Sequence, residues 1–165
     1  MAAHQIFRIN LVFAFLVWGV IAWQAIWPAL RERARADALR PILYLHSLRF
    51  VGLSFLIPGV VSPELPAAFA GPAAWGDLIT AALALVALVT LPSRAGIFVV
   101  WIFNVVGFVD LLNAFYTGIR LGVSDEPGIQ GAAYYIPSFY VPLLIVTHLL
   151  VFWLLLRKDP SMERQ

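Results

Sequence analysis

Five side chains in this sequence are polar but lie inside long apolar stretches. They are His46, Arg49, Asn104, Asp110 and His148. Polar and ionisable groups are rare in hydrocarbon, where they mark ligand sites, proton pathways or ion pairs. An imidazole can ligate a metal or haem iron, and a carboxylate can relay a proton. We therefore take these five residues as candidate ligand-binding residues.

Arg49 is the residue with the strongest need for a partner. It lies three residues after His46, so a helix places both side chains on one face. A guanidinium stays charged, and at this depth it cannot easily reach water by extending its side chain. Its possible partners are Asp110, a bound anionic ligand, helix-end carbonyls or a water-filled cavity. A purely structural ion pair is the alternative to a functional role.

Depth along the helices, counted at about 1.5 Å per residue, sorts the polar residues into two groups. The inner layer contains Gln24, His46, Arg49, Asn104, Thr147 and His148. The outer group contains Asp77, Asp110 and Asn113. This count places Asp110 roughly 10 Å farther out than Arg49. Hydrogen bonds between helices would explain the histidines and asparagines without a ligand, and a helix N-terminus would explain Asp77.

The composition shows why so few positions are polar. Hydrophobic residues make up 62% of the 165 residues, and charged residues only 12%. Soluble domains have about 45–50% apolar and 25% charged residues. A chain this apolar cannot hide its surface in water, whereas a bilayer solvates it. We expect an all-α polytopic transmembrane helix bundle in the cell membrane, the inner membrane of a bacterium.

Five apolar runs are long enough to be helices of a single transmembrane domain. The expected helices cover about residues 9–30, 41–57, 75–91, 95–116 and 134–156. Pro41 suits a first helical position, and Pro58 with Gly59 ends the second helix. The first run exceeds the roughly 7–15 apolar residues of a signal peptide, so we expect it to be retained.

Lysine and arginine are unequally divided between the two ends of these helices. One end carries Arg31, Arg33, Arg35, Arg40, Arg94, Arg157, Lys158 and Arg164, and the other carries Arg8 and Arg120. Cytoplasmic loops are the ones enriched in Lys and Arg. The N-terminus is therefore expected outside and the C-terminus in the cytoplasm.

The external connection over residues 58–76 is unusual for a loop. It carries four prolines and is otherwise mostly apolar. A solvated loop would be more polar, so this segment either covers the outer interface or enters the membrane to line a ligand cavity.

The sequence lacks the residues that several kinds of chemistry require. The chain has no cysteine, which excludes disulfides, thiolate metal sites and iron–sulfur clusters. Glycine-rich phosphate loops, nucleophile elbows and zinc-protease helices are absent too. The net charge of +2 comes from loop arginines and does not indicate nucleic-acid binding. We expect a component that is not an enzyme.

Three functions fit the polar residues. The favoured one is binding of a hydrophobic or redox ligand, such as a quinone, or service as an accessory subunit of a membrane redox complex. In this function the protein acts in a larger membrane complex or as a homo-oligomer. The second is a b-type haem protein with His46 and His148 as axial ligands. The third is a small transporter or proton relay that uses Asp110 and Arg49.

One segment resembles a known family. The run from Arg49 through Gly52 and Phe55 to Gly59 is similar to the arginine–glycine–aromatic–glycine helix of DoxX-like small membrane proteins, and the apolar run between Gly76 and Arg94 is similar to their next helix. The resemblance covers residues 46–95. It implies a four-helix core with an added first helix, an accessory role near quinone or thiol redox enzymes, and Arg49 as a site residue. The chain departs from the family in having no basic residue after Gly59 and no cysteine.

Overall fold

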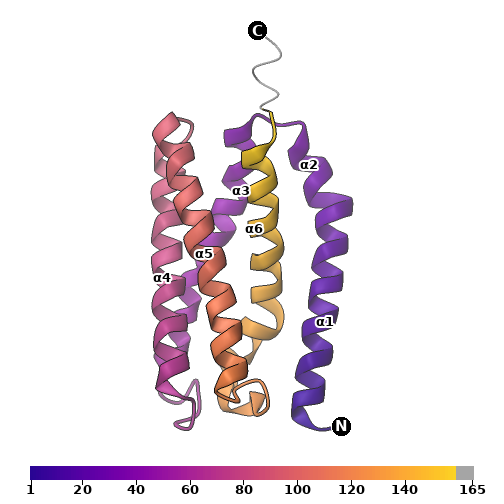
Figure 1. Ribbon diagram of the computed structural model, residues 1–165, viewed down its shortest axis with the longest axis vertical. Coiled ribbons are helices and arrows are strands. Elements are labelled where there is room, and N and C mark those ends of the chain that lie inside the picture. The colour runs from indigo at the N-terminus through magenta and orange to yellow at the C-terminus, as the bar shows by residue number, and fades with distance from the viewer. Residues whose placement is uncertain (159–165) are drawn as a thin grey trace.

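The computed structural model describes residues 1–158 and is entirely helical in its regular structure (Figure 1). Its six α-helices are α1 Ala3–Ile21, α2 Trp27–Arg31, α3 Arg35–Ser47, α4 Ala67–Thr90, α5 Arg94–Arg120 and α6 Val141–Leu156. Two π-helices, η1 Ala22–Ile26 and η4 Ile136–Tyr140, and two 3-10 helices, η2 Leu48–Leu56 and η3 Pro127–Tyr134, extend or connect them. Because several segments are contiguous, they form five rods: α1–η1–α2, α3–η2, α4, α5 and η4–α6.

Four of these rods are long and apolar enough to cross a membrane. They are Ala3–Arg31, Ala67–Thr90, Arg94–Arg120 and Ile136–Leu156. This confirms the expectation of an all-α, multi-pass membrane protein. The rod expected over residues 41–57 is composite, because α3 changes to 3-10 geometry at Leu48. A 3-10 helix rises about 2.0 Å per residue, so α3 and η2 together are about 38 Å long.

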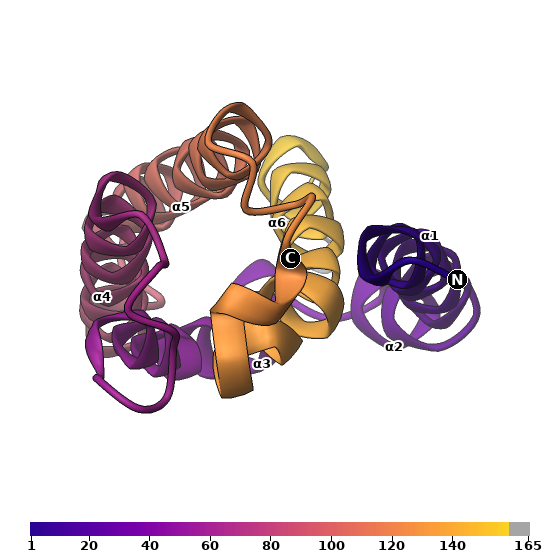
Figure 2. The same ribbon diagram turned by 90° about the horizontal axis from the view of Figure 1, so that it is seen from below.

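The rods form a ring with one helix outside it. Seen along the long axis, α3, α4, α5 and α6 enclose the centre, and α1 lies beyond α6 (Figure 2). α1 packs on α6, η4 and η3 through aromatic contacts, such as Trp18 on Phe139 with ring centroids 5.4 Å apart. Its other face exposes Val12, Phe13 and Leu16, as expected of a helix whose outer face contacts lipid.

The apolar core has two parts that flank the polar residues. One part centres on Leu39, Leu43, Phe103 and Leu154, near the ends of the rods that carry most of the arginines. The other contains Phe55, Phe69, Leu111, Val123 and Leu144 near the opposite ends. Along the four rods of the ring the buried polar side chains come between these two clusters. The fold therefore holds a polar layer at mid-height, closed on one side by a fully apolar core.

The proline-rich connection covers one end of the ring. α4 begins at Ala67, eight residues before the expected helix start, because Pro66 takes the N-cap position and the helix tolerates Pro72 inside it. The remaining connection pairs with η3: the Ser62 amide donates to the Ile129 carbonyl, and the Ala132 amide donates to the Val60 carbonyl, each at 2.9 Å. This part of the connection is thus a cover that is tied to η3.

A glycine fixes the close approach of these two segments. Gly131 has φ of +52°, and a Cβ built there would lie 2.1 Å from the Val60 carbonyl oxygen. Only glycine accommodates both the left-handed backbone and this short distance. The proline-rich connection and η3, joined by backbone hydrogen bonds, therefore cover the end of the bundle nearest to Asp77 and Asp110.

Candidate functional site

Arg49 stands at the centre of the polar layer. It is 0% exposed, and it is the second residue of η2, directly after α3 ends. Its Nε donates to Asp77 Oδ1 on α4 at 2.7 Å, and its Nη2 donates to Asp110 Oδ2 on α5 at 2.7 Å. One guanidinium thus joins two carboxyl groups from two other helices. We call Arg49, Asp77 and Asp110 the charged cluster.

The remaining donors of Arg49 are also used. Its Nη1 lies 3.2 Å from the Gly107 carbonyl oxygen on α5 and 3.2 Å from His148 Nε2 on α6. A buried ion pair compensates its desolvation only when its other hydrogen-bonding groups are satisfied as well. Arg49 meets that condition, and its contacts tie together η2, α4, α5 and α6.

The contact with Arg49 sets the state of His148. A guanidinium can only donate, so His148 Nε2 accepts and carries no proton. The Nδ1 atom therefore donates to Asn104 Oδ1, 2.7 Å away, and Asn104 Nδ2 donates in turn to the His148 carbonyl oxygen at 3.2 Å. The hydrogen-bond pattern thus assigns a neutral imidazole with a fixed ring orientation.

His46 forms a second, parallel arrangement on α3. The Thr147 hydroxyl donates to the carbonyl oxygens of α6, with Leu143 at 2.9 Å, so it accepts from His46 Nε2 at 2.9 Å. Among the described residues, His46 Nδ1 has no hydrogen-bond partner. The ring lies against that of His148, with centroids 4.3 Å apart. His46 is therefore also neutral and is packed inside the ring of helices.

Glycines make room for the carboxyl groups. A Cβ at Gly52 on η2 would lie 2.1 Å from Asp77 Oδ2, and a Cβ at Gly76 on α4 would lie 1.7 Å from Asp110 Oδ1. Neither distance is possible for real atoms, so any side chain at these positions would displace a carboxylate. The sequence places each acid opposite a glycine of the neighbouring rod, and that spacing allows the helices to approach closely enough to share Arg49.

The two carboxyl groups of the charged cluster, Asp77 and Asp110, form the floor of a cavity of about 50 Å³. Its lining includes Phe7, Phe55, Phe69, Asp77, Asp110, Leu111, Phe115, Ser124 and Gln130. Asp77 and Asp110 face the cavity, whereas Arg49 does not line it and lies behind them. A water molecule needs about 10–15 Å³ of such space, so the cavity has room for a few waters or a small polar head group. We call it the site cavity.

Gln130 adds a polar side chain to the lining of the site cavity. It belongs to η3, is 1% exposed, and lines the site cavity. Among the described residues no donor lies within hydrogen-bond distance of its Oε1 atom. A buried acceptor without a partner is costly, so this amide is suited to receive a hydrogen bond from a bound molecule.

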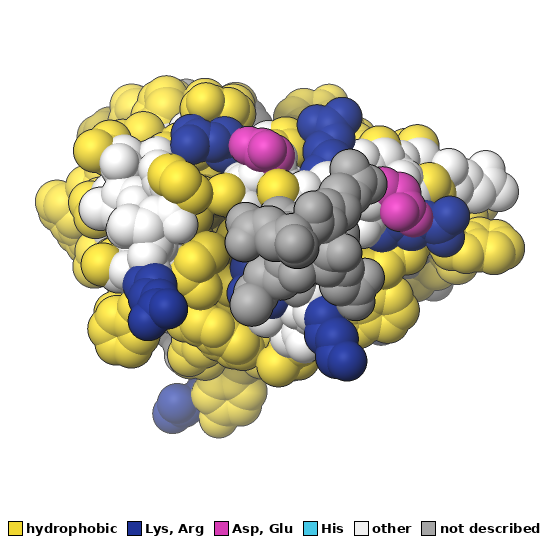
Figure 3. Space-filling view, turned by 90° about the horizontal axis from the view of Figure 1, so that it is seen from above, with side chains coloured by type: hydrophobic (Ala, Val, Ile, Leu, Met, Phe, Trp, Pro, Cys, Tyr) yellow, Lys and Arg dark blue, Asp and Glu magenta, His cyan; other side chains and the backbone are white. Residues whose placement is uncertain are grey.

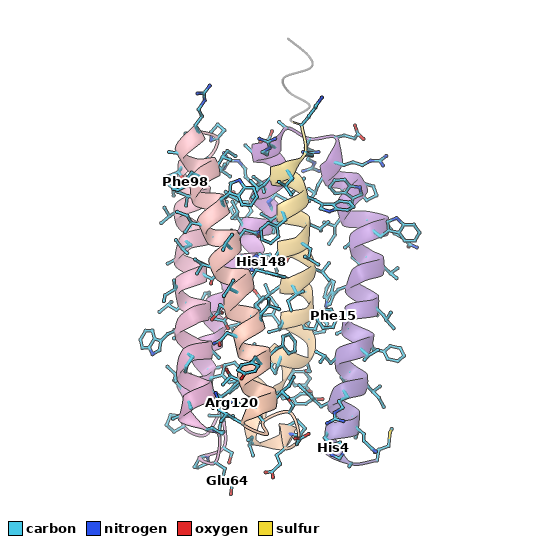
Figure 4. The ribbon with its side chains drawn as sticks, viewed as in Figure 1. His4, Phe15, Glu64, Phe98, Arg120 and His148 are labelled. Carbon is cyan, nitrogen blue, oxygen red and sulfur yellow. The ribbon has the colours of Figure 1, made fainter. Side chains whose placement is uncertain are left out.

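The structure brings the five candidate residues together. His46, Arg49, Asn104, Asp110 and His148 all lie in the polar layer, and the labelled His148 lies near mid-height of the bundle (Figure 4). Arg49 and Asp110, counted as roughly 10 Å apart in depth, form a 2.7 Å ion pair, so Asp110 is one of the partners that the sequence indicated as possible. Counting residues along the axis neglected the length of the arginine side chain, the greater rise of η2 and the tilt of α5 (Figure 1).

Three other expectations need correction. Gln24, placed in the inner layer, lies in η1 with an exposed side chain, and Asn113, placed in the outer group, is exposed on α5. Both belong to faces that point away from the ring, which a depth count alone does not reveal. Asp77 is not at a helix N-terminus, because α4 starts ten residues earlier at Ala67. It pairs with Arg49 instead, and neither it nor Gln130 was among the candidate site residues.

The histidine geometry does not fit axial ligation of haem. The His46 and His148 rings are in direct contact, and the Nε2 atom of each is engaged with Thr147 or Arg49. An axial pair needs both rings to point at one iron from opposite faces of a porphyrin. There is no space for that plane between rings whose centroids are 4.3 Å apart. Within residues 1–158, no group of three or more His, Asp or Glu side chains could hold a metal ion.

Comparison with known proteins identifies the family of the chain. Residues 6–156 match the model of a domain of unknown function, DUF8737, and the chain belongs to that family. No curated protein and no solved structure matches the chain. The matched segment contains every residue of the charged cluster and all of the residues that line the site cavity, so the site is part of the family's own domain.

Loss of Arg49 should destabilise the fold strongly. In Arg49→Gln two buried carboxyl groups lose their counter-charge, and removal of one partner from a buried pair costs about 3–5 kcal/mol. The thermal unfolding midpoint in detergent should therefore fall by many degrees. The matched control is Arg8→Gln, which breaks an ion pair with Asp125 whose side chains are 65% and 62% exposed. That control should unfold at nearly the parental temperature, and equal losses in both variants would contradict a stabilising role for the charged cluster.

Proposed function

We propose that this protein binds a small hydrophobic molecule inside the membrane, with the polar head of the molecule in the site cavity. The proposal rests on one observation, which is that the cavity combines mostly aromatic and aliphatic walls with two carboxyl groups at its inner end. Phe55 and Phe69, with ring centroids 5.5 Å apart, belong to an aromatic wall, whereas Asp77 and Asp110 form a carboxyl floor. Ligand sites have this character, with mostly apolar lining and a few convergent polar groups.

The polar groups of the cavity favour a ligand that donates hydrogen bonds. Asp77, Asp110 and the Gln130 Oε1 atom offer acceptor oxygens, and the donors of Arg49 are already taken up by protein acceptors. An oxidised quinone offers only acceptors, whereas its reduced form carries two hydroxyl donors. For a redox ligand, the cavity therefore supports binding of the quinol. Such a site suits an accessory protein beside membrane redox enzymes, in line with the DoxX-like resemblance.

The arrangement gives less support to a proton relay across the whole membrane. Arg49 separates the carboxyl groups from His148, and a guanidinium does not pass protons because it does not deprotonate. Beyond the histidines the bundle is filled by Leu39, Leu43 and Leu154, all 0% exposed. The charged cluster is thus reached from one side only in this conformation.

We also propose five membrane spans with the N-terminus outside. The α3–η2 rod has the length of a span although its helix type changes at Leu48. Lys and Arg side chains surround the end at which α3 and α5 begin and α6 ends (Figure 3). The excess of Lys and Arg on that side favours the cytoplasm for it, and for a bacterial protein the membrane would be the inner membrane.

This topology can be tested by cysteine labelling, since the natural chain has no cysteine. Single cysteines are introduced at Glu64, before α4, and at Ala95, at the start of α5, both of which are exposed. In intact cells a membrane-impermeant maleimide should label Glu64→Cys and should label Ala95→Cys only after lysis. The reverse pattern would contradict the orientation, and labelling of both in intact cells would contradict a membrane-spanning α4.

Filling the cavity should abolish ligand binding. Ala73 lines the site cavity on α4, and Ala73→Phe places a ring in the space that a ligand head would occupy. With decylubiquinol as the probe, native mass spectrometry of the protein in nanodiscs should detect one retained quinol on the parental chain. Retention should fall at least about tenfold in Ala73→Phe, which corresponds to about 1.4 kcal/mol.

The control is Ala82→Phe, which adds the same ring to an exposed position on the same helix. It should retain quinol like the parental chain. Ala114→Leu, a smaller change in the cavity wall, guards against misfolding of Ala73→Phe and should also reduce retention. Equal retention in the parental, Ala73→Phe and Ala114→Leu chains would place any bound quinol elsewhere and would contradict the proposal.

A further inference from the structure

The charged cluster has unequal numbers of positive and negative groups. Arg49 contributes one guanidinium, and Asp77 and Asp110 contribute two carboxyl groups. With both carboxyl groups ionised the cluster carries one net negative charge inside the membrane. An uncompensated charge is expensive in a low-dielectric interior, so a further positive charge must be supplied. Either a proton on the carboxyl pair or a bound cation can supply it.

The neighbouring groups do not supply this charge. His148 on α6 is neutral because its Nε2 atom accepts from Arg49. His46 on α3 is neutral because its Nε2 atom donates to Thr147 and a second proton on the buried Nδ1 atom would have no acceptor. Tyr140 on η4 uses its hydroxyl to donate to the Leu45 carbonyl oxygen at 2.9 Å. Arg49 on η2 is the one cation that faces the carboxyl groups in the described part of the chain. The missing charge must therefore come from solution or from a ligand.

The cavity places such a ligand against the acids. Asp77 and Asp110 face it from the floor, with Arg49 behind them, and Gln130, whose Oε1 atom has no hydrogen-bond partner in the described part of the chain, lines it from η3. All three side chains present acceptor oxygens, which an ammonium group with several N–H donors satisfies. The aromatic faces of Phe55, Phe69 and their neighbours can stabilise a cation and also hold an apolar tail.

An inorganic ion matches these surroundings less well. Ca²⁺ takes about 6–8 oxygen ligands, and Mg²⁺ also binds mainly through carboxylates. Within residues 1–158 no group of three or more His, Asp or Glu side chains could hold a metal ion, and four phenylalanines line the cavity beside its two acids. An organic cation uses both parts of the lining, since its charge meets the acids and its carbon atoms meet the aromatic rings.

On this basis, and as a more specific form of the function proposed above, we infer that the ligand head is a single positive charge. The ligand class is a primary or secondary ammonium on an apolar tail. When it binds, its charge replaces the proton on the Asp77–Asp110 pair, and that proton leaves to the aqueous phase. One proton is therefore released for each ammonium that binds. Lower pH weakens ammonium binding because protons compete for the same site.

The test compares two probes with the same tail, hexylammonium and hexanol. The full chain is placed in phosphatidylcholine nanodiscs, and empty nanodiscs correct for partition into lipid. Calorimetric titration should show hexylammonium binding about ten- to a hundredfold more tightly than hexanol, the range given by a hydrogen bond to a charged group. Repeating the titration in buffers of different ionisation enthalpy should show about one proton released per ammonium bound. Affinity should rise with pH by up to about tenfold per unit until the site has lost its proton.

Asp110→Asn is the decisive variant, because Arg49 and Asp77 still balance each other and the fold should persist. It should lose the preference for hexylammonium and the proton release, while hexanol binding remains. Gln130→Leu provides a second variant in which the charges are untouched and the ammonium loses one acceptor. The control Asp125→Asn removes an exposed carboxylate outside the cavity and should behave like the parental chain.

Each outcome separates this inference from the proposed function. Equal binding of hexanol and hexylammonium, sensitive to Ala73→Phe but without proton release, would overturn the inference and leave the hydrophobic site intact. If none of hexylammonium, hexanol and decylubiquinol binds, both this inference and the proposed hydrophobic binding site are overturned. If sodium chloride displaces hexylammonium as effectively as another alkylammonium does, the site does not select an organic cation, and the inference is overturned. If folded Asp110→Asn still binds hexylammonium more tightly than hexanol by the parental factor, the proposed role of Asp77 and Asp110 is overturned.

Discussion

The structure depends on one buried guanidinium that two carboxyl groups and two further acceptors surround. Arg49 is 0% exposed, and its contacts join η2 to α4, α5 and α6. In a bilayer, apolar side chains give little driving force for helices to associate, because lipid is equally apolar. An ion pair that cannot be satisfied by lipid therefore specifies which helices meet and at what height. The same interaction leaves one carboxyl group in excess, and this connects the architecture to a possible ligand.

The surrounding fold serves that interaction. Glycines at positions 52 and 76 leave space for Asp77 and Asp110, and Asn104 with His148 fixes the imidazole that accepts from Arg49. One side of the layer is closed by an apolar core, and the other opens into the site cavity. This asymmetry supports the proposed binding site over an isolated structural ion pair, because a structural pair does not require acids that face a cavity or a buried amide oxygen without a partner in the cavity lining.

The sequence predicted the class of fold and five of the polar residues from composition and hydrophobicity alone. It also indicated that Arg49 needs a partner, because burial of a guanidinium has few solutions. It named Asp110 as one possible partner but could not choose it over the others, since axial depth ignores side-chain reach and helix tilt. Asp77 was assigned to a helix terminus because that helix was expected to start near residue 75. Gln130 had no signal, because a glutamine after Pro127 and Gly128 looks like an ordinary loop residue. The outward direction of Gln24 and Asn113 required knowledge of how the rods are rotated.

The central claim is that the three charges of the cluster act as a unit, and a stability cycle tests it most directly. The thermal unfolding of Arg49→Gln is compared with that of the triple variant Arg49→Gln, Asp77→Asn, Asp110→Asn. Charges that depend on one another give non-additive losses, and removal of all three leaves no uncompensated charge in the membrane. The triple variant should regain most of the stability that Arg49→Gln loses. A triple variant less stable than Arg49→Gln, with the three losses adding, would contradict this claim.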